Sequence, residues 1–108
     1  MTTLIKNGTV VSATGRHDVD VLVDGETIAA LLQPGSDPAA SAASGAETVI
    51  DATGRYVVPG GIDCHTHMEL PFGGTFASDT FEIGTRAAAW GGTTTIIDFV
   101  VQRYGENV

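Results

Sequence analysis

The sequence is poor in cysteine and in basic residues, and it has no long hydrophobic run. A single cysteine among 108 residues cannot form a disulfide within the chain, which fits a reducing compartment. Five basic residues against thirteen acidic ones give a net charge of −8, and no basic cluster is available to neutralise phosphates. The apolar runs are too short to span a bilayer, and the first residues lack a signal-peptide pattern. We therefore expect a soluble cytoplasmic protein that binds neither nucleic acid nor a membrane.

Short β-strands separated by turns are predicted for the first 58 residues. Asn7-Gly8 and Asp24-Gly25 each lie between apolar or alternating segments, and both dipeptides are hairpin signals. Residues 33–46 are rich in glycine, proline, serine and alanine, which predicts a flexible surface loop. These patterns together predict a small antiparallel β unit.

The pattern changes in residues 59–108. Residues 62–67 read as a strand buried on both faces, and residues 93–99 are β-branched and apolar, as is typical of a buried parallel strand. Between them, Asp79 as N-cap and Glu82 as the third helical residue match a capping box. A strand, a helix and a strand within about forty residues predict a βαβ unit and hence a parallel sheet.

Two of the three histidines lie two residues apart at the end of the first of these strands. Side chains alternate along a strand, so Asp63, His65 and His67 are expected to face one way and Cys64, read as a small buried hydrophobe, the other. Residues two apart on a strand are separated by roughly 6.5–7 Å, and two imidazoles can converge on one ion from there. The carboxyl ends of parallel strands are where α/β proteins build active sites. Since a bare His-x-His is a weak signal, the alternative of two unrelated histidines stays open.

A metal site made only from this chain would be incomplete. A catalytic zinc normally takes three protein ligands and a water molecule. The third histidine, His17, is interpreted as a solvated loop residue. Asp63 and Asp98 are candidates to hydrogen bond to the metal ligands, although Asp98 is equally well read as a polar strand end that caps a loop. We assign no catalytic residue within the chain.

One segment closely resembles the hydantoinase and dihydropyrimidinase branch of the metal-dependent amidohydrolases: Val57–Phe99, VVPGGIDCHTHMELPFGGTFASDTFEIGTRAAAWGGTTTIIDF. The β-rich segment before it resembles the N-terminal part of the small β-sandwich of that family. The resemblance implies an α/β fold, with residues 1–58 as part of this composite sandwich domain. Residues 59–108 would be the first βαβ unit of a (β/α)8 TIM barrel. A barrel needs about 250 residues, so the chain is interpreted as an N-terminal fragment that is inactive alone.

The resemblance also implies a function for the complete protein. His65 and His67 match the His-x-His that binds one zinc of a two-metal centre, and Leu70 and Phe72 lie in the loop that shapes the substrate pocket. The implied reaction is hydrolysis of a cyclic ureide, either a dihydropyrimidine or a 5-substituted hydantoin, to an N-carbamoyl amino acid. The implied assembly is a homotetramer.

Other readings are weighed against this one. Dihydroorotases resemble the family but carry an arginine two positions after the second histidine, where it suits a substrate carboxylate. This chain has Glu69 there, which favours an uncharged ring, and its PFGGT loop favours a hydantoinase over an allantoinase. A non-catalytic scaffold is the main alternative, and the retained histidines argue against it. A self-contained metal-binding module is disfavoured because two histidines leave an ion half ligated.

Overall fold

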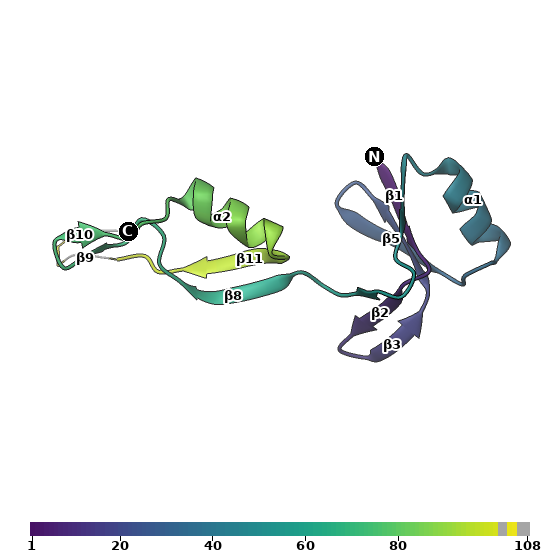
Figure 1. Ribbon diagram of the computed structural model, residues 1–108, viewed down its shortest axis with the longest axis horizontal. Coiled ribbons are helices and arrows are strands. Elements are labelled where there is room, and N and C mark those ends of the chain that lie inside the picture. Colours follow the sequence, from purple (N-terminus) through teal and green to yellow (C-terminus); the bar gives the residue numbers. More distant parts are fainter. Residues whose placement is uncertain (102–103, 106–108) are drawn as a thin grey trace. The chain divides into compact units, whose positions relative to one another are not determined.

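The computed structural model describes residues 1–101 and 104–105 of the chain, and the contacts divide it into two units, Met1–Pro59 and Gly60–Val108 (Figure 1). The first unit contains β1 (Thr2–Lys6), β2 (Thr9–Ser12), β3 (Gly15–Asp18), β4 (Asp20–Asp24), β5 (Thr27–Leu32), α1 (Asp37–Gly45), β6 (Thr48–Asp51) and β7 (Tyr56–Val57). The second contains β8 (Gly61–Thr66), β9 (Pro71–Phe72), β10 (Thr75–Phe76), α2 (Phe81–Trp90) and β11 (Thr93–Asp98). Neither α1 nor α2, the helices of the described residues, is long and apolar enough to cross a membrane.

Two mixed sheets make up the first unit. One has the strand order β5-β4-β1-β6 and the other the order β3-β2-β7. The prediction of an antiparallel unit is confirmed for the pairs β1–β4, β4–β5 and β2–β3, but it is wrong for two others: β1 pairs in parallel with β6, and β2 pairs in parallel with β7. These parallel pairs form where the chain returns after α1. Leu4 on the central strand β1 is fully buried, and Val21, Ala39 and Ala52 are also buried.

The dipeptide Asn7-Gly8 is a crossover between the two sheets and not the predicted hairpin. Asn7 has a φ of 63°, its backbone N–H donates to Asp20 Oδ1 at 2.9 Å, and its side-chain amide donates to Asp51 Oδ1 at 3.0 Å. The left-handed conformation that the dipeptide favours is therefore used to redirect the chain. The Asp24-Gly25 prediction is confirmed, because β4 and β5 form an antiparallel hairpin there.

The segment predicted to be a flexible loop contains helix α1. Ser36 is the N-cap, its side chain accepts a hydrogen bond from the N–H of Ala39, and proline occupies the first turn, where a missing N–H costs nothing. Alanine, the strongest helix former, supplies four of the nine helical residues. The composition suggested a loop, but the order of the residues specifies a capped helix.

The predicted βαβ unit is confirmed in the second unit. Strands β8 and β11 pair in parallel, and α2 connects them (Figure 1). The N-cap of α2 is Thr80, whose hydroxyl accepts from the N–H of Ile83, and not Asp79 as predicted. The prediction that both strands are buried is wrong for the described residues, since Ile62 is 67% exposed and Ile97 54% exposed. A two-stranded sheet with one helix has too little surface to cover both of its faces.

Gly8→Ala should destabilise the chain. A Cβ at this position would lie 2.7 Å from Val57 Cγ2 and 2.9 Å from Ala52 Cβ, so the crossover would be overpacked. We expect a loss of about 1–3 kcal/mol in the free energy of unfolding, measured by urea denaturation. Gly45→Ala is the matched control, because among the described residues no atom beyond the adjacent chain and the α1 backbone lies within 4 Å of a Cβ there, and α1 gains a better helix former. An equal loss in both variants would contradict the crossover packing.

Asp51 should titrate far below an ordinary aspartate. Hydrogen bonds from the Thr53 hydroxyl and the Asn7 amide lower the pKa of Asp51 from 3.8 to about 2. The ionised carboxylate therefore contributes to stability above about pH 4, and this contribution is lost as the pH falls toward 2. Thr53→Val removes the strongest of these donors and should raise the pKa, measured by carboxyl ¹³C NMR. The Thr27 hydroxyl donates to the carbonyl of Asp24 instead, so Thr27→Val should leave the pKa of Asp51 unchanged. An Asp51 titration in Thr53→Val that is identical to the wild type would contradict the role of the Thr53 hydroxyl.

Candidate metal centre

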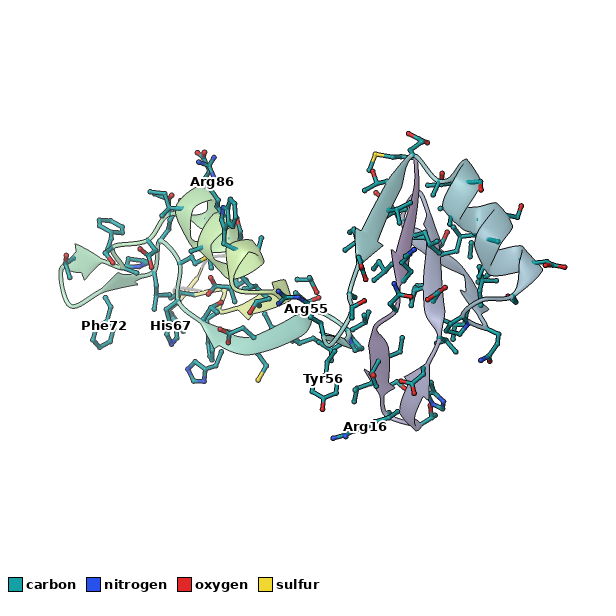
Figure 2. All side chains as sticks on the ribbon, turned by 45° about the vertical axis from the view of Figure 1, so that its right-hand side comes forward. Arg16, Arg55, Tyr56, His67, Phe72 and Arg86 are labelled. Atoms are coloured by element: carbon teal, nitrogen blue, oxygen red, sulfur yellow. The ribbon has the colours of Figure 1, made fainter. Side chains whose placement is uncertain are left out.

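The two histidines meet at the carboxyl end of β8. His65 lies in the strand and His67 is the first residue after Thr66, the last residue of β8. Their Nε2 atoms are 3.2 Å apart, and the two rings lie edge to face with an interplanar angle of 81°. Figure 2 shows His67 and Phe72 projecting from the side of the second unit that lies opposite Arg86 of α2. The alternation of side chains along the strand thus brings the imidazoles together, as the spacing predicts.

The separation of these nitrogens fits one shared metal ion. Two nitrogens that are 3.2 Å apart and each 2.0–2.1 Å from a zinc ion subtend about 100° at the ion, close to a tetrahedral angle. Across residues 1–101 and 104–105, no cluster of three or more histidine, cysteine or acidic side chains is placed to hold a metal. The pair therefore fits one half of a four-coordinate ligand set.

Phe99 contacts both imidazoles and was missed by the sequence analysis. Its ring centroid lies 5.0 Å from that of His65 and 4.8 Å from that of His67. The signal that could have identified it is the register of the parallel sheet. Asp98 is paired with Thr66, so the next residues along the two strands, Phe99 and His67, lie side by side. The aromatic ring packs against the imidazoles and restricts their orientations.

Two carboxylates shape the backbone around the histidines. Asp63 Oδ1 accepts a hydrogen bond from the N–H of His65 at 3.1 Å. Asp98 Oδ2 accepts one from the N–H of Met68 at 2.9 Å, and its Oδ1 accepts one from the N–H of Phe99 at 2.6 Å. The bond from Met68 is the main reason that the pKa of Asp98 is lowered, and the bond from the N–H of Phe99 adds to the effect. In the described part of the chain, neither carboxylate is hydrogen bonded to an imidazole, so both act on the backbone beside the histidines.

The predictions for Cys64 and His17 also need correction. Cys64 is exposed and not buried as expected, because the described residues leave β8 uncovered. His17 lies on strand β3 of the first unit and not in a turn, and it is exposed as expected. Neither residue belongs to the pair of imidazoles.

An apolar hollow adjoins the histidine pair. The loop after β8 forms the hairpin β9–β10, whose two turn residues Gly73 and Gly74 have φ values of 60° and 82°. Positive φ at both central positions is typical of the type I′ turn that suits a tight hairpin. The hollow has a volume of about 470 Å³ and is lined by His67, Leu70, Phe72, Thr75, Phe76 and Ala77. The structure thus brings Leu70 and Phe72 to the same hollow as His67, and it adds Phe76, which the sequence analysis missed.

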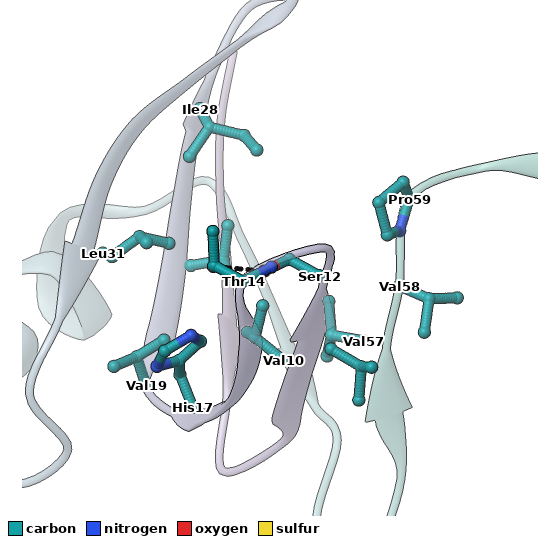
Figure 3. Close-up of a pocket in the computed structure, with 12 residues that line it drawn as sticks. Val10, Ser12, Thr14, His17, Val19, Ile28, Leu31, Val57, Val58 and Pro59 are labelled. Atoms are coloured by element: carbon teal, nitrogen blue, oxygen red, sulfur yellow. Dashed lines mark hydrogen bonds between the residues drawn. The ribbon is translucent and has the colours of Figure 1, made fainter.

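A larger hollow of about 580 Å³ lies in the first unit (Figure 3). Its walls are mainly valine side chains, together with Ile28, Leu31 and Pro59. Among the described residues that line it, His17 is the one titratable residue. With neither a carboxylate nor a second histidine among these residues, they offer no ligand set for a metal and no pair of groups for proton transfer.

A parallel βαβ unit with paired imidazoles at the end of its first strand is the arrangement expected of a metal-dependent α/β enzyme. Residues 56–107 match the model of the amidohydrolase family. A D-hydantoinase of Streptomyces coelicolor is 58% identical over 98% of this chain and 22% of its own length. Dihydropyrimidinase 2 of Caenorhabditis elegans is 50% identical over 100% of this chain and 20% of its own length. The chain belongs to the amidohydrolase family, in the branch of the hydantoinases and dihydropyrimidinases.

Solved structures agree with these sequence relatives. A crystal structure of a D-hydantoinase matches with a TM-score of 0.85 and 52% identity, over 98% of this chain and 22% of that one. The dihydropyrimidinase of Brevibacillus agri matches with a TM-score of 0.84 and 50% identity over the same shares. This likeness confirms the predicted fold class, part of a β-sandwich followed by the start of a (β/α)8 barrel. The chain spans about a fifth of the length of these relatives.

Replacing Phe99 should free the two imidazoles. In Phe99→Leu the aromatic ring that faces both histidines is lost while apolar volume is kept. We expect the imidazole proton resonances of His65 and His67 to move, because ring currents at a centroid distance of about 5 Å are removed. The resonances of His17, which lies in the other unit, provide the internal control. Unchanged His65 and His67 spectra would contradict the observed packing.

Proposed function

We propose that this chain contributes part of the active site of a metal-dependent cyclic amidase, within a protein of the full length of its relatives. The reaction is hydrolysis of the cyclic amide bond of a dihydropyrimidine or a 5-substituted hydantoin, which yields an N-carbamoyl amino acid. The observation that carries this proposal is the 3.2 Å approach of the Nε2 atoms of His65 and His67 beside an apolar hollow. The names of the relatives, D-hydantoinase and dihydropyrimidinase, support the substrate class.

The geometry supports a role for each of these residues. His65 and His67 would hold a divalent ion, for which we propose zinc, as one of two in the complete site. Bound metal lowers the pKa of a water molecule, so that it can act as a nucleophile near neutral pH. Phe99 restricts the orientations of both imidazoles, and Asp98 fixes the backbone directly after His67 through the N–H of Met68.

The hollow beside His67 suits the substituent of an uncharged ring. Leu70, Phe72 and Phe76 give it apolar walls, which bind an alkyl or aryl group and exclude water. Among the described residues that line it, there is no lysine or arginine to pair with a substrate carboxylate. Arg86 lies on α2, where it forms an ion pair with Glu82 at 2.8 Å. This arrangement favours a hydantoin or dihydropyrimidine over a carboxylated ring such as dihydroorotate.

The proposal also includes the domain boundaries within the chain. We assign residues 1–58 to the composite β-sandwich domain and residues 59–108 to the first βαβ unit of the barrel. A cytoplasmic location and a homotetramer stay predictions, as does the number of zinc ions.

The histidine pair can be tested against the third histidine of the chain. In the full-length protein, His65→Ala and His67→Ala should each lower the metal content and reduce kcat/KM for hydantoin or dihydrouracil at least about 100-fold. Replacing a residue that only hydrogen bonds to a metal ligand typically lowers metal affinity or activity 10–100-fold, so replacing a ligand itself should lower them more. His17→Ala, an exposed change on β3, is the matched control and should keep both metal and activity.

Metal content is measured by mass spectrometry and ring opening by loss of ultraviolet absorbance. Full metal content and activity in His65→Ala and His67→Ala would contradict the assignment of the ligands. A metal-loaded wild type that is inert toward both rings would contradict the proposed reaction itself.

A further inference from the structure

Glu69 holds an unfavourable backbone conformation two residues after His67. Its φ is 52°, and Asn7 is the one other non-glycine residue with positive φ among the described residues. For a residue with a Cβ this left-handed conformation is costly, and it persists where the surroundings hold it in place. Asparagine adopts this conformation readily and glutamate does not, so the backbone conformation of Glu69 needs a physical cause.

Glu69 makes two hydrogen bonds that join the ends of one loop. Its backbone N–H donates to the carbonyl oxygen of Asp79 at 2.9 Å, and its Oε1 accepts from the N–H of Phe81 at 3.1 Å. Phe81 is the first residue of α2, so its N–H has no partner within the helix. A carboxylate at a helix N-terminus also interacts favourably with the helix dipole. Glu69 thus ties the start of the loop directly to the start of α2.

The loop closed in this way carries the apolar walls of the hollow. Between Glu69 and Asp79 lies the hairpin β9–β10, with a further bond from the N–H of Ala77 to the carbonyl of Leu70 at 2.8 Å. The histidine side of the hollow is anchored separately, through the N–H of Met68 and Asp98. The position of the hairpin relative to His67 therefore depends on the Glu69 contacts, while that of His67 depends on the β8–β11 sheet.

We propose that Glu69 is a positioning residue that fixes the hairpin against α2 and thereby sets the affinity for the substrate's apolar substituent. This inference rests on the proposed function. The two Glu69 hydrogen bonds, called here the Glu69 clamp, hold the apolar hairpin and not the histidines. Loss of this clamp should therefore weaken binding of a substituted ring and leave the chemistry of the ring unchanged. The effect is thus a change in KM that depends on the substituent.

The test uses Glu69→Ala and Glu69→Gln in the full-length protein. Alanine keeps a Cβ and therefore the backbone strain, so the comparison isolates the carboxylate. We expect Glu69→Ala to raise KM for 5-phenylhydantoin about tenfold, in keeping with the loss of a hydrogen bond to a charged group, with kcat and metal content unchanged. KM for hydantoin, the ring without a substituent, should stay the same. Glu69→Gln keeps an acceptor oxygen and should restore most of the affinity.

Glu82→Gln is the matched control. Glu82 also lies in the first turn of α2, but its carboxylate pairs with Arg86, so both KM values should match the wild type. Three results for Glu69→Ala would each overturn the proposal: loss of metal, an equal change in KM for both substrates, or no change in KM for either.

Amide hydrogen exchange tests the clamp without any activity. Faster exchange at Ala77 and Phe81 in Glu69→Ala, with Met68 unchanged, is the expected result. Equal protection in wild type and variant would overturn the clamp. A wild type that is inert toward both hydantoins but shows this exchange difference would refute the proposed function and retain the clamp.

Discussion

The parallel pairing of β8 with β11 is the constraint on which the rest of the second unit depends. It brings the carboxyl ends of the two strands to the same edge, with Asp98 opposite Thr66. From this register, the Asp98 carboxylate reaches the N–H of Met68, and the Phe99 ring reaches both imidazoles. A shift of one residue would turn each of these side chains to the opposite face. The convergence of His65 and His67 is thus a property of the strand pair as well as of the His-x-His spacing.

The histidines and the apolar hairpin are held by different contacts. The sheet and Asp98 fix the histidines, whereas Glu69 and the N-terminus of α2 fix the hairpin. Under the proposed function, the two parts of the site could therefore differ in sequence independently: the proposed metal ligands could stay constant while the hairpin accommodates different substituents.

The sequence predicted features that depend on local rules. Side-chain alternation placed His65 and His67 on one face, and the strand–helix–strand order gave the βαβ unit. Features set by distant partners were not predicted. Asn7-Gly8 reads as a hairpin, yet its contacts with Asp20 and Asp51 make it a crossover. The positive φ of Glu69 depends on its bonds to Asp79 and Phe81, which no local pattern reveals. Helix α1 does have a local sequence signal, since Ser36 and the proline that follows mark a helix start. The loop-like composition of the segment led to the wrong prediction.

We propose that Nε2 of His65 and Nε2 of His67 bind the same metal ion. The most direct measurement is a crystal structure of the full-length protein with anomalous diffraction recorded on both sides of the zinc absorption edge. An ion shared by the pair should give an anomalous peak about 2.0–2.1 Å from both Nε2 atoms, with Phe99 packed against the two rings. A peak bonded to one histidine alone or through Nδ1, or metal bound elsewhere with the pair left free, would contradict it.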